Sequence, residues 1–242
     1  MQAIVRARGL LEVLRDERKA KTSGGIYHKV QVELAYNSNR IEGSSLSLDE
    51  TRWIFETATV QKGARVDDVV ETANHFRCVD LLIDRARYPL TEGFIKKLHG
   101  VLKNGTADSR QSWFNVGGYK RLPNEVGGME TASPETTPAL MRQLVCSYNA
   151  SKAKTLRELL AFHWEFEALH PFQDGNGRVG RLILFKECLR CGIVPFVIKD
   201  EKKWFYYRGL HEWQRDETFL VETARDAQDE FKTWLEYFRI PF

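Results

Sequence analysis

The helical spacing of apolar residues, which continues through nearly all of the 242 residues, is the feature that most restricts the fold. Apolar side chains recur three and four positions apart, as in Leu156, Leu159 and Leu160, and so share one face of a helix. Ten helices are predicted on this pattern, at residues 2–20, 26–42, 48–60, 66–87, 91–103, 136–150, 155–169, 176–190, 200–214 and 217–238. The sequence therefore predicts an all-α fold.

One stretch, residues 115–135, lacks this spacing. It contains four glycines and is interpreted as a loop or a short hairpin. We find no internal repeat, low-complexity tract or long linker elsewhere. Residues 1–242 are therefore interpreted as one domain that carries an irregular flap.

Composition excludes several classes of protein. With 43% hydrophobic residues the chain can form a sizeable core, and its net charge is only 36 − 33 = +3. Disorder and a histone-like polycation are excluded, and nucleic acid is not an expected partner. Charged residues interrupt the first apolar stretch, and no window is long enough for a membrane span, so a cytoplasmic location is expected. Four cysteines are expected to be reduced thiols: Cys78, Cys146, Cys188 and Cys191.

The segment from His170 to Arg181, HPFQDGNGRVGR, carries most of the chemical information. It lies between a predicted helix that ends near Leu169 and another that begins near Asn176. Its close glycines allow backbone N–H groups to turn inward at the start of the second helix. Such N–H groups and the helix dipole together form a site for a phosphate.

Four side chains of this segment suit chemistry on a nucleotide phosphate. Arg178 and Arg181 lie three residues apart on one helix face and can both bind phosphate oxygens. Asp174 is a hard oxygen ligand of the kind that holds Mg²⁺. His170 has a pKa range suited to taking a proton from a hydroxyl.

Two motif interpretations of this segment fail on context. Gly175, Gly177 and Gly180 have the G-x-G-x-x-G spacing of a dinucleotide-binding turn, but that turn follows a strand and residues 162–169 are predicted helical. The segment also resembles the start of a calcium loop. The required glycine and final glutamate of that loop are here Val179 and Phe185.

Two further interpretations rest on single residues or a small set. His163, Glu167 and His170 could place three metal ligands on one face, although His163 lies on an apolar stripe and is better interpreted as core. Asp174 or Asn176 could be a helix N-cap. A helix cap would account for only one of the twelve residues of the segment His170–Arg181.

The pattern H-P-F-x-D-G-N-G-R-x-x-R of His170–Arg181 matches the signature of Fic-domain proteins, the Fic/Doc superfamily, at every defining position. Residues 118–120, Gly-Tyr-Lys, resemble the family's Gly-x-Tyr-Arg element, with Lys in place of Arg. The resemblance covers about residues 30–215. It implies a Fic fold, with a helical core and a short β-hairpin flap near the active site.

The resemblance implies transfer of AMP from ATP to a Tyr, Thr or Ser hydroxyl of a target protein, with release of pyrophosphate. His170 would be the general base, and Asp174 would hold Mg²⁺. The other residues would bind the nucleotide: Gly175, Asn176 and Gly177 as the anion hole, Arg178 on the phosphates and Arg181 on the γ-phosphate. Doc kinases carry Lys at the position of Gly177, which disfavours phosphate transfer. Transfer of another nucleotide or of phosphocholine stays open.

A second motif, Ser38-Asn-Arg-Ile-Glu42-Gly43, ends a predicted helix. A negative charge in the last turn opposes the helix dipole, and a local rule broken in this way often marks a functional site. The motif resembles the inhibitory helix of Fic proteins, here at about 26–43. The resemblance implies that Glu42, supported by Ser38, pairs with Arg181 and leaves ATP bound unproductively.

Two alternatives to an autoinhibited transferase remain. In a de-AMPylase of the same fold, Glu42 would orient a water that releases AMP. In a protein of a different class, the site would be a catalytically silent nucleotide-binding regulator. The intact His170 and Asp174 argue against the second alternative.

The helix predicted near residues 200–214 resembles the family helix whose tyrosine pair lies near the adenine. Tyr206 and Tyr207 are the candidates, with plain core as the alternative interpretation. Trp213-Gln214 stands where the family often has Ala-Asn, which leaves the nucleotide preference open. The flap would clamp an extended target segment by strand addition, although its Gly127-Gly128 departs from the expected flap. Self-modification and a homodimer are further expectations from the resemblance.

Overall fold

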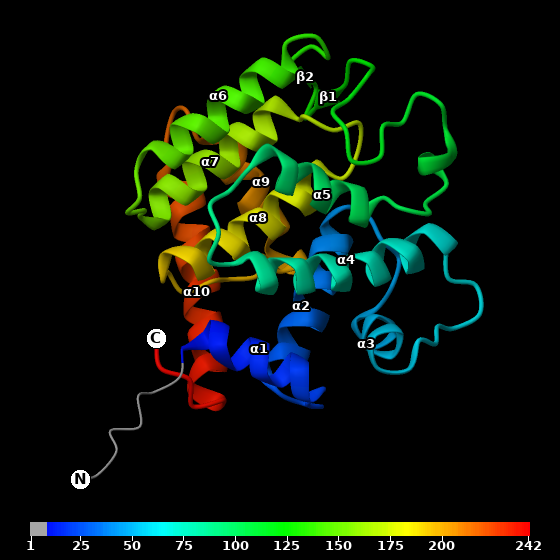
Figure 1. Ribbon diagram of the computed structural model, residues 1–242, viewed down its shortest axis with the longest axis vertical. Coiled ribbons are helices and arrows are strands. Elements are labelled where there is room, and N and C mark those ends of the chain that lie inside the picture. Colours follow the sequence, from blue (N-terminus) through cyan, green and yellow to red (C-terminus); the bar gives the residue numbers. More distant parts are fainter. Residues whose placement is uncertain (1–8) are drawn as a thin grey trace.

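The structure is a computed structural model that describes residues 9–242, and its architecture is all-α as expected (Figure 1). The α-helices are α1 (Leu10–Ala20), α2 (Ile26–Ile41), α3 (Leu48–Thr57), α4 (Val66–Arg85), α5 (Glu92–Leu102), α6 (Thr137–Ala150), α7 (Leu156–Leu169), α8 (Asn176–Cys191), α9 (Lys203–Glu212) and α10 (Thr218–Tyr237). Two short 3₁₀ turns lie at Asp108–Arg110 and Asp200–Lys202. Among the described helices, none is long and apolar enough to pass through a bilayer.

Most predicted helix bounds lie within two residues of the observed ones, and three predicted helices need separate comment. The first residues of the predicted helix 2–20 lie outside the described residues. The helix predicted at 48–60 ends at Thr57, because Ala58 adopts a left-handed conformation with φ +54°. The helix predicted at 200–214 is divided into a 3₁₀ turn and α9, which ends at Glu212.

Side-chain caps explain where several helices begin. At α3, the Ser47 side chain accepts from the backbone N–H of Glu50 while the Glu50 side chain accepts from the backbone N–H of Ser47, and the two form a capping box. Thr155 and Glu158 form a second capping box at α7. Such reciprocal pairs satisfy backbone N–H groups that have no partner within the helix, and so they fix its first residue.

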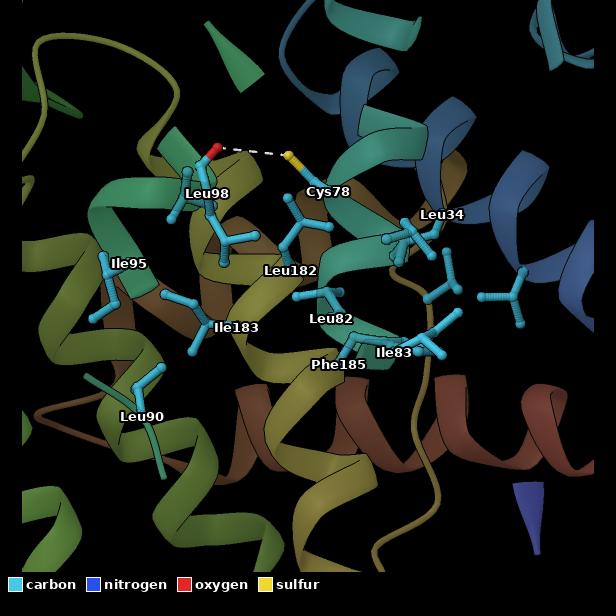
Figure 2. Packing of buried hydrophobic residues seen from close by; sticks show 14 of the residues in the cluster. Leu34, Cys78, Leu82, Ile83, Leu90, Ile95, Leu98, Leu182, Ile183 and Phe185 are labelled. Atoms are coloured by element: carbon cyan, nitrogen blue, oxygen red, sulfur yellow. Dashed lines mark hydrogen bonds between the residues drawn. The ribbon is translucent and has the colours of Figure 1, made fainter. Parts of the chain in front are cut away.

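Helix α8 is the centre of the core, and α2, α4, α5 and α7 all pack against it (Figure 1). In Figure 2, apolar side chains of α8 interdigitate with those of neighbouring helices: Leu182, Ile183 and Phe185 with Leu34, Leu82, Ile83, Ile95 and Leu98. Cys78 also lies there, and its Sγ donates to the Leu98 carbonyl at 3.5 Å. All four cysteines are free thiols, as expected. Because α8 is held on several sides, its N-terminal end has a fixed position.

A two-stranded hairpin forms the flap. Strand β1 (Glu125–Val126) pairs antiparallel with β2 (Met129–Glu130). The intervening Gly127 and Gly128 have φ of +60° and +78°, and a two-residue hairpin turn with both central φ values positive favours glycine strongly. The glycine pair that departed from the expected flap is therefore its turn.

Candidate active site

The loop between α7 and α8 is closed by its own side chains. His170 ends α7 in a left-handed conformation with φ +49° and so turns the chain. The Asn176 side chain then clamps the loop, since its Oδ1 accepts from the Phe172 N–H and its Nδ2 donates to the Phe172 carbonyl, both at 2.8 Å. The Phe172 ring is fully buried and stacks on the His99 ring, with 4.0 Å between the two ring centroids. The loop is therefore an ordered anchor for the residues around it.

Two of the simpler interpretations of this loop are wrong. A helix precedes it rather than the strand that a dinucleotide-binding turn requires. The N-cap of α8 is Gly175, which makes no side-chain cap, so neither Asp174 nor Asn176 caps the helix.

His170 is arranged as a proton acceptor. Its Nδ1 lies 3.3 Å from the carbonyl oxygen of Glu167, and because a carbonyl can only accept, the proton is on Nδ1. The Nε2 atom is then left with a lone pair. Burial lowers the pKa of His170, and the nearby Lys120 ammonium lowers it further. The imidazole is therefore neutral at neutral pH, which suits a general base.

Four charged side chains form a closed ring beside the loop. Lys103 Nζ contacts Glu71 Oε1 at 2.5 Å and also contacts Asp174 Oδ2. Arg178 contacts Glu71 Oε2, and its Nη2 lies 3.1 Å from Asp174 Oδ2. Although burial alone raises the pKa of Asp174, Arg178 and Lys103 hold it well below its ordinary value. Asp174 is therefore an anion.

The surroundings of Asp174 fit a magnesium ion. Its side chain is 43% exposed, and it borders a polar hollow of about 190 Å³ that Glu42 and Arg65 also line. Mg²⁺ binds through one or two carboxylates and keeps waters and phosphate oxygens as its other ligands, which a hollow of this kind accommodates.

The alternative set of metal ligands is not formed. His163 is buried, its Nε2 lies 2.8 Å from the Tyr206 hydroxyl, and its Nδ1 is 3.9 Å from Glu167 Oε1. The described residues hold no group of three or more histidine, cysteine or acidic side chains placed for a metal ion. His163 belongs to the core, as its apolar stripe indicated.

The expected contact between Glu42 and Arg181 is present. Arg181 Nη2 donates to Glu42 Oε1 at 2.6 Å and to the Ser38 carbonyl at 2.9 Å, and its Nε donates to Ser38 Oγ at 3.0 Å. Glu42 lies one residue beyond α2, rather than in its last turn, and Gly43 follows with φ +89°. Burial alone lowers the pKa of Arg181, but Glu42 raises it, so the guanidinium stays charged.

The Glu42 carboxylate also lies directly over the first turn of α8. A Cβ atom at Gly177 would come within 2.3 Å of Glu42 Oε1. Exposed N–H groups and the positive end of the helix dipole make this end of a helix a site for anions. The C-cap residue of α2 therefore places a carboxylate beside the first turn of α8, where it contacts Arg181.

The tyrosine pair is divided between two environments. Tyr206 is 2% exposed and lies behind Arg181, with its ring centre 5.8 Å from the guanidinium. Its expected contact with adenine is therefore not supported, because the ring belongs to the core. Tyr207 is 37% exposed, and its hydroxyl donates to the Ile41 carbonyl at 3.0 Å. Of the pair, only Tyr207 offers a ring face to a ligand.

Lys120, which stands in place of the family's arginine, joins the flap to the loop. Its ammonium donates to Asn124 Oδ1 at 2.7 Å, to Thr131 Oγ1 at 2.6 Å and to the Leu169 carbonyl at 3.3 Å. Its backbone N–H donates to the Pro171 carbonyl at 2.9 Å. The substituted lysine thus ties both sides of the hairpin to the end of α7.

Sequence reasoning missed the partners of the loop, Glu71 and Lys103. It also missed the position of Glu167, whose Oε1 has no hydrogen-bond partner among the described residues. A Cβ at Gly180 would lie 2.1 Å from this oxygen, so α8 needs glycine there. Gly180 within a helix is the signal in the sequence that could have indicated a close approach.

Glu167→Gln is expected to be more stable than the wild type, by a difference in the free energy of unfolding that grows as the pH rises. Burial raises the pKa of Glu167 from 4.5 to about 8, so between these values the folded state binds a proton that the unfolded state has lost. The stability of the wild type therefore falls as pH rises from about 4.5 through about 8. By pH 8 the variant is expected to be more stable by on the order of 1–3 kcal/mol, with a smaller difference at pH 5. Thermal unfolding at both pH values measures this, with exposed Glu222→Gln as the control; a difference that stays constant with pH contradicts it.

Comparison with known proteins shows what this fold and loop are similar to. Residues 89–187 match the Fic domain of the Fic/DOC family. A curated relative, protein adenylyltransferase Fic of Drosophila grimshawi, is 27% identical over 201 residues, which cover 80% of this chain and 39% of the relative. The chain thus matches about two fifths of the length of that relative.

Solved structures agree with this match. A Fic domain-containing signaling protein from Bacteroides thetaiotaomicron superposes with a TM-score of 0.75 at 26% identity, over 93% of this chain and 94% of the other. Fic-1 from C. elegans shares the fold with a TM-score of 0.74 at 20% identity, over 95% and 72% of the two chains. The chain therefore has a match to the Fic/DOC family at residues 89–187 and shares the fold of these Fic-domain structures.

Proposed function

We propose that this protein is a protein adenylyltransferase that transfers AMP from ATP to a Tyr, Thr or Ser hydroxyl of a target protein. The observation that carries the proposal is the first turns of α8, where Arg181 already holds a carboxylate beside Gly177. A site that accepts a carboxylate between a helix N-terminus and an arginine suits a phosphate group. The names of the Drosophila relatives support the same activity.

In this proposal each residue of the loop has a separate role in the reaction. The N–H groups at the start of α8, with Arg178 and Arg181, bind the phosphates of ATP and orient the α-phosphorus. Asp174 would hold Mg²⁺, which neutralises charge on the phosphates. His170 Nε2 takes the proton of the target hydroxyl while the oxygen of that hydroxyl bonds to the α-phosphorus. The bond from the α-phosphorus to the bridging oxygen breaks, and pyrophosphate leaves with that electron pair.

The target hydroxyl would be presented by the flap. Strands β1 and β2 form a two-stranded sheet, so the outer edge of each strand has backbone groups available for an added strand. Lys120 connects this hairpin to the residue before His170, as its contact with the Leu169 carbonyl indicates. A target segment paired with the flap would therefore be held at a fixed position relative to the base.

Autoinhibition is part of the proposal. The Glu42 carboxylate accepts from Arg181 and lies beside Gly177, so a γ-phosphate cannot bind Arg181 in the same place. A second candidate function uses the same carboxylate. If Glu42 orients a water instead, the site would release AMP from a modified protein, which is the de-AMPylase alternative.

Intact-protein mass spectrometry and radiolabelling together test the proposal. The protein is incubated with Mg²⁺ and with ATP labelled at either the α- or the γ-phosphate, and an EDTA-treated reaction serves as the control. AMP transfer predicts protein-bound label from the α-phosphate and none from the γ-phosphate. Label from the γ-phosphate alone would replace the proposal with phosphate transfer. Parallel reactions with UTP and CDP-choline test the other groups that the loop could transfer.

A further inference from the structure

The charged ring beside the loop gives Asp174 a resident partner. Lys103 and Arg178 each contact both carboxylates, Glu71 and Asp174, so the ring is closed and carries equal numbers of positive and negative charges. Both cations contact the same oxygen of Asp174, Oδ2. The carboxylate to which we assign the magnesium ion is therefore already neutralised by the protein.

Lys103 is held in this position by more than its charge. It is the residue after α5, it is 2% exposed, and a Cβ at Gly175 would lie 3.5 Å from its Cδ. The stem thus packs along the loop while the ammonium reaches across to Asp174. Asp108 Oδ2 is 3.8 Å from the same ammonium. A buried cation placed among three carboxylates is a built part of the site.

The two cations of the ring differ in how readily they can release Asp174. Arg178 lies on α8 within the core, and its planar guanidinium is oriented by Glu71. Lys103 ends in a compact ammonium on a flexible four-carbon chain, which can turn away without moving a helix. A divalent cation at Asp174 would be repelled by a like charge at hydrogen-bonding distance from the same oxygen.

We infer that Lys103 is the resident counter-ion of Asp174 and competes with the divalent cation for this carboxylate. The nucleotide-free protein would then bind the metal weakly, and strong binding would follow only when Lys103 leaves Asp174. This inference rests on the proposed role of Asp174 as the magnesium ligand. It makes Lys103 a positioning residue that sets the metal affinity of the site.

Binding of Mn²⁺ alone, followed by electron paramagnetic resonance without nucleotide, tests this inference. Lys103→Met is expected to bind Mn²⁺ about 10-fold more tightly than the wild type, because removal of the ammonium leaves the ring with a net negative charge. Lys103→Arg keeps the charge and is expected to bind as weakly as the wild type. The matched control is Lys97→Met on the exposed face of α5, which should change nothing.

Asp174→Asn separates the two ways in which this experiment can fail. If it abolishes the Mn²⁺ binding of the Lys103→Met protein, Asp174 is the metal ligand. With that result, equal or weaker binding by Lys103→Met than by the wild type overturns the competition. If Asp174→Asn leaves the Mn²⁺ binding of the Lys103→Met protein unchanged, Asp174 is not the metal ligand, and the inference about Lys103 is overturned with that role. Should Lys103→Met unfold, Lys103→Gln removes the charge while keeping a donor for Glu71, and absence of tighter binding by it also overturns the inference.

Discussion

Glu42→Gly is expected to raise AMP transfer by this protein by one to two orders of magnitude. The substitution removes the carboxylate that lies over Gly177 and that accepts from Arg181 at 2.6 Å. A hydrogen bond to a charged group contributes about 1.5–3 kcal/mol, which corresponds to roughly 10- to 150-fold in binding. One donor of Arg181 and the space beside Gly177 become available to the γ-phosphate.

A graded series of variants makes this prediction specific. Glu42→Gln removes the charge but keeps the volume, so we expect a smaller increase than for glycine. Ser38→Ala removes one of the two contacts between Ser38 and Arg181 and leaves Glu42 in place, so its increase should be the smallest. The readout is label from the α-phosphate of ATP, on the protein itself or on an added target. Equal labelling by the wild type and Glu42→Gly contradicts the inhibitory role.

His170→Ala is expected to lower the rate of AMP transfer by about 10²- to 10⁴-fold, the usual contribution of a general base. The measurement is best made in the Glu42→Gly protein, where the starting rate is highest. Because the imidazole is assigned to the target hydroxyl rather than to the phosphates, kcat should fall while the affinity for ATP changes little. Calorimetric titration with ATP separates these two effects.

Two further observations check the assignment of His170. Since the pKa of His170 is lowered by burial, the rate in the Glu42→Gly protein should rise with pH through a value below 6.5. The control variant is His211→Ala, because the His211 side chain on α9 is 70% exposed. A His170→Ala protein that keeps the full rate would mean that another group takes the proton.

The helices and the loop could be predicted because their signals are local. The spacing of apolar residues located the helices, and a pair of residues three apart, Ser47 and Glu50, caps the start of α3. The loop HPFQDGNGRVGR is held together by contacts within itself, such as that between Phe172 and Asn176. Because the interacting residues are close in the sequence, local structure of this kind can be recognised from the sequence alone.

The charged ring could not be predicted for the opposite reason. Arg178 and Glu71 are 107 residues apart, and Asp174 and Lys103 are 71 apart. Neither Glu71 nor Lys103 interrupts a pattern, because a glutamate on a helix and a lysine at a helix end are ordinary. Their proximity follows from the packing of α4 and α5 around α8, which no short motif encodes.

The contact of Glu42 with Arg181, across 139 residues, lies between these cases. From the residues alone, only an unfavourable charge near a helix end was visible, and the partner came from the family resemblance. Tyr206 shows the limit of such a resemblance. The residue type agrees with the family, but its burial is decided by the packing of α9 in this chain.

Helix α2 contains Ser38 and ends next to Glu42, the two residues of the proposed inhibition. It is also part of the core, since Val30 and Leu34 are fully or almost fully buried. Loss of one buried leucine side chain costs about 2–5 kcal/mol, against a total stability of about 5–15 kcal/mol for a typical domain. Deletion of α2 would therefore remove the fold together with the inhibition. Substitutions that relieve the proposed inhibition and keep the fold are therefore expected at Ser38 and Glu42, at the end of this helix, rather than as deletions of the helix.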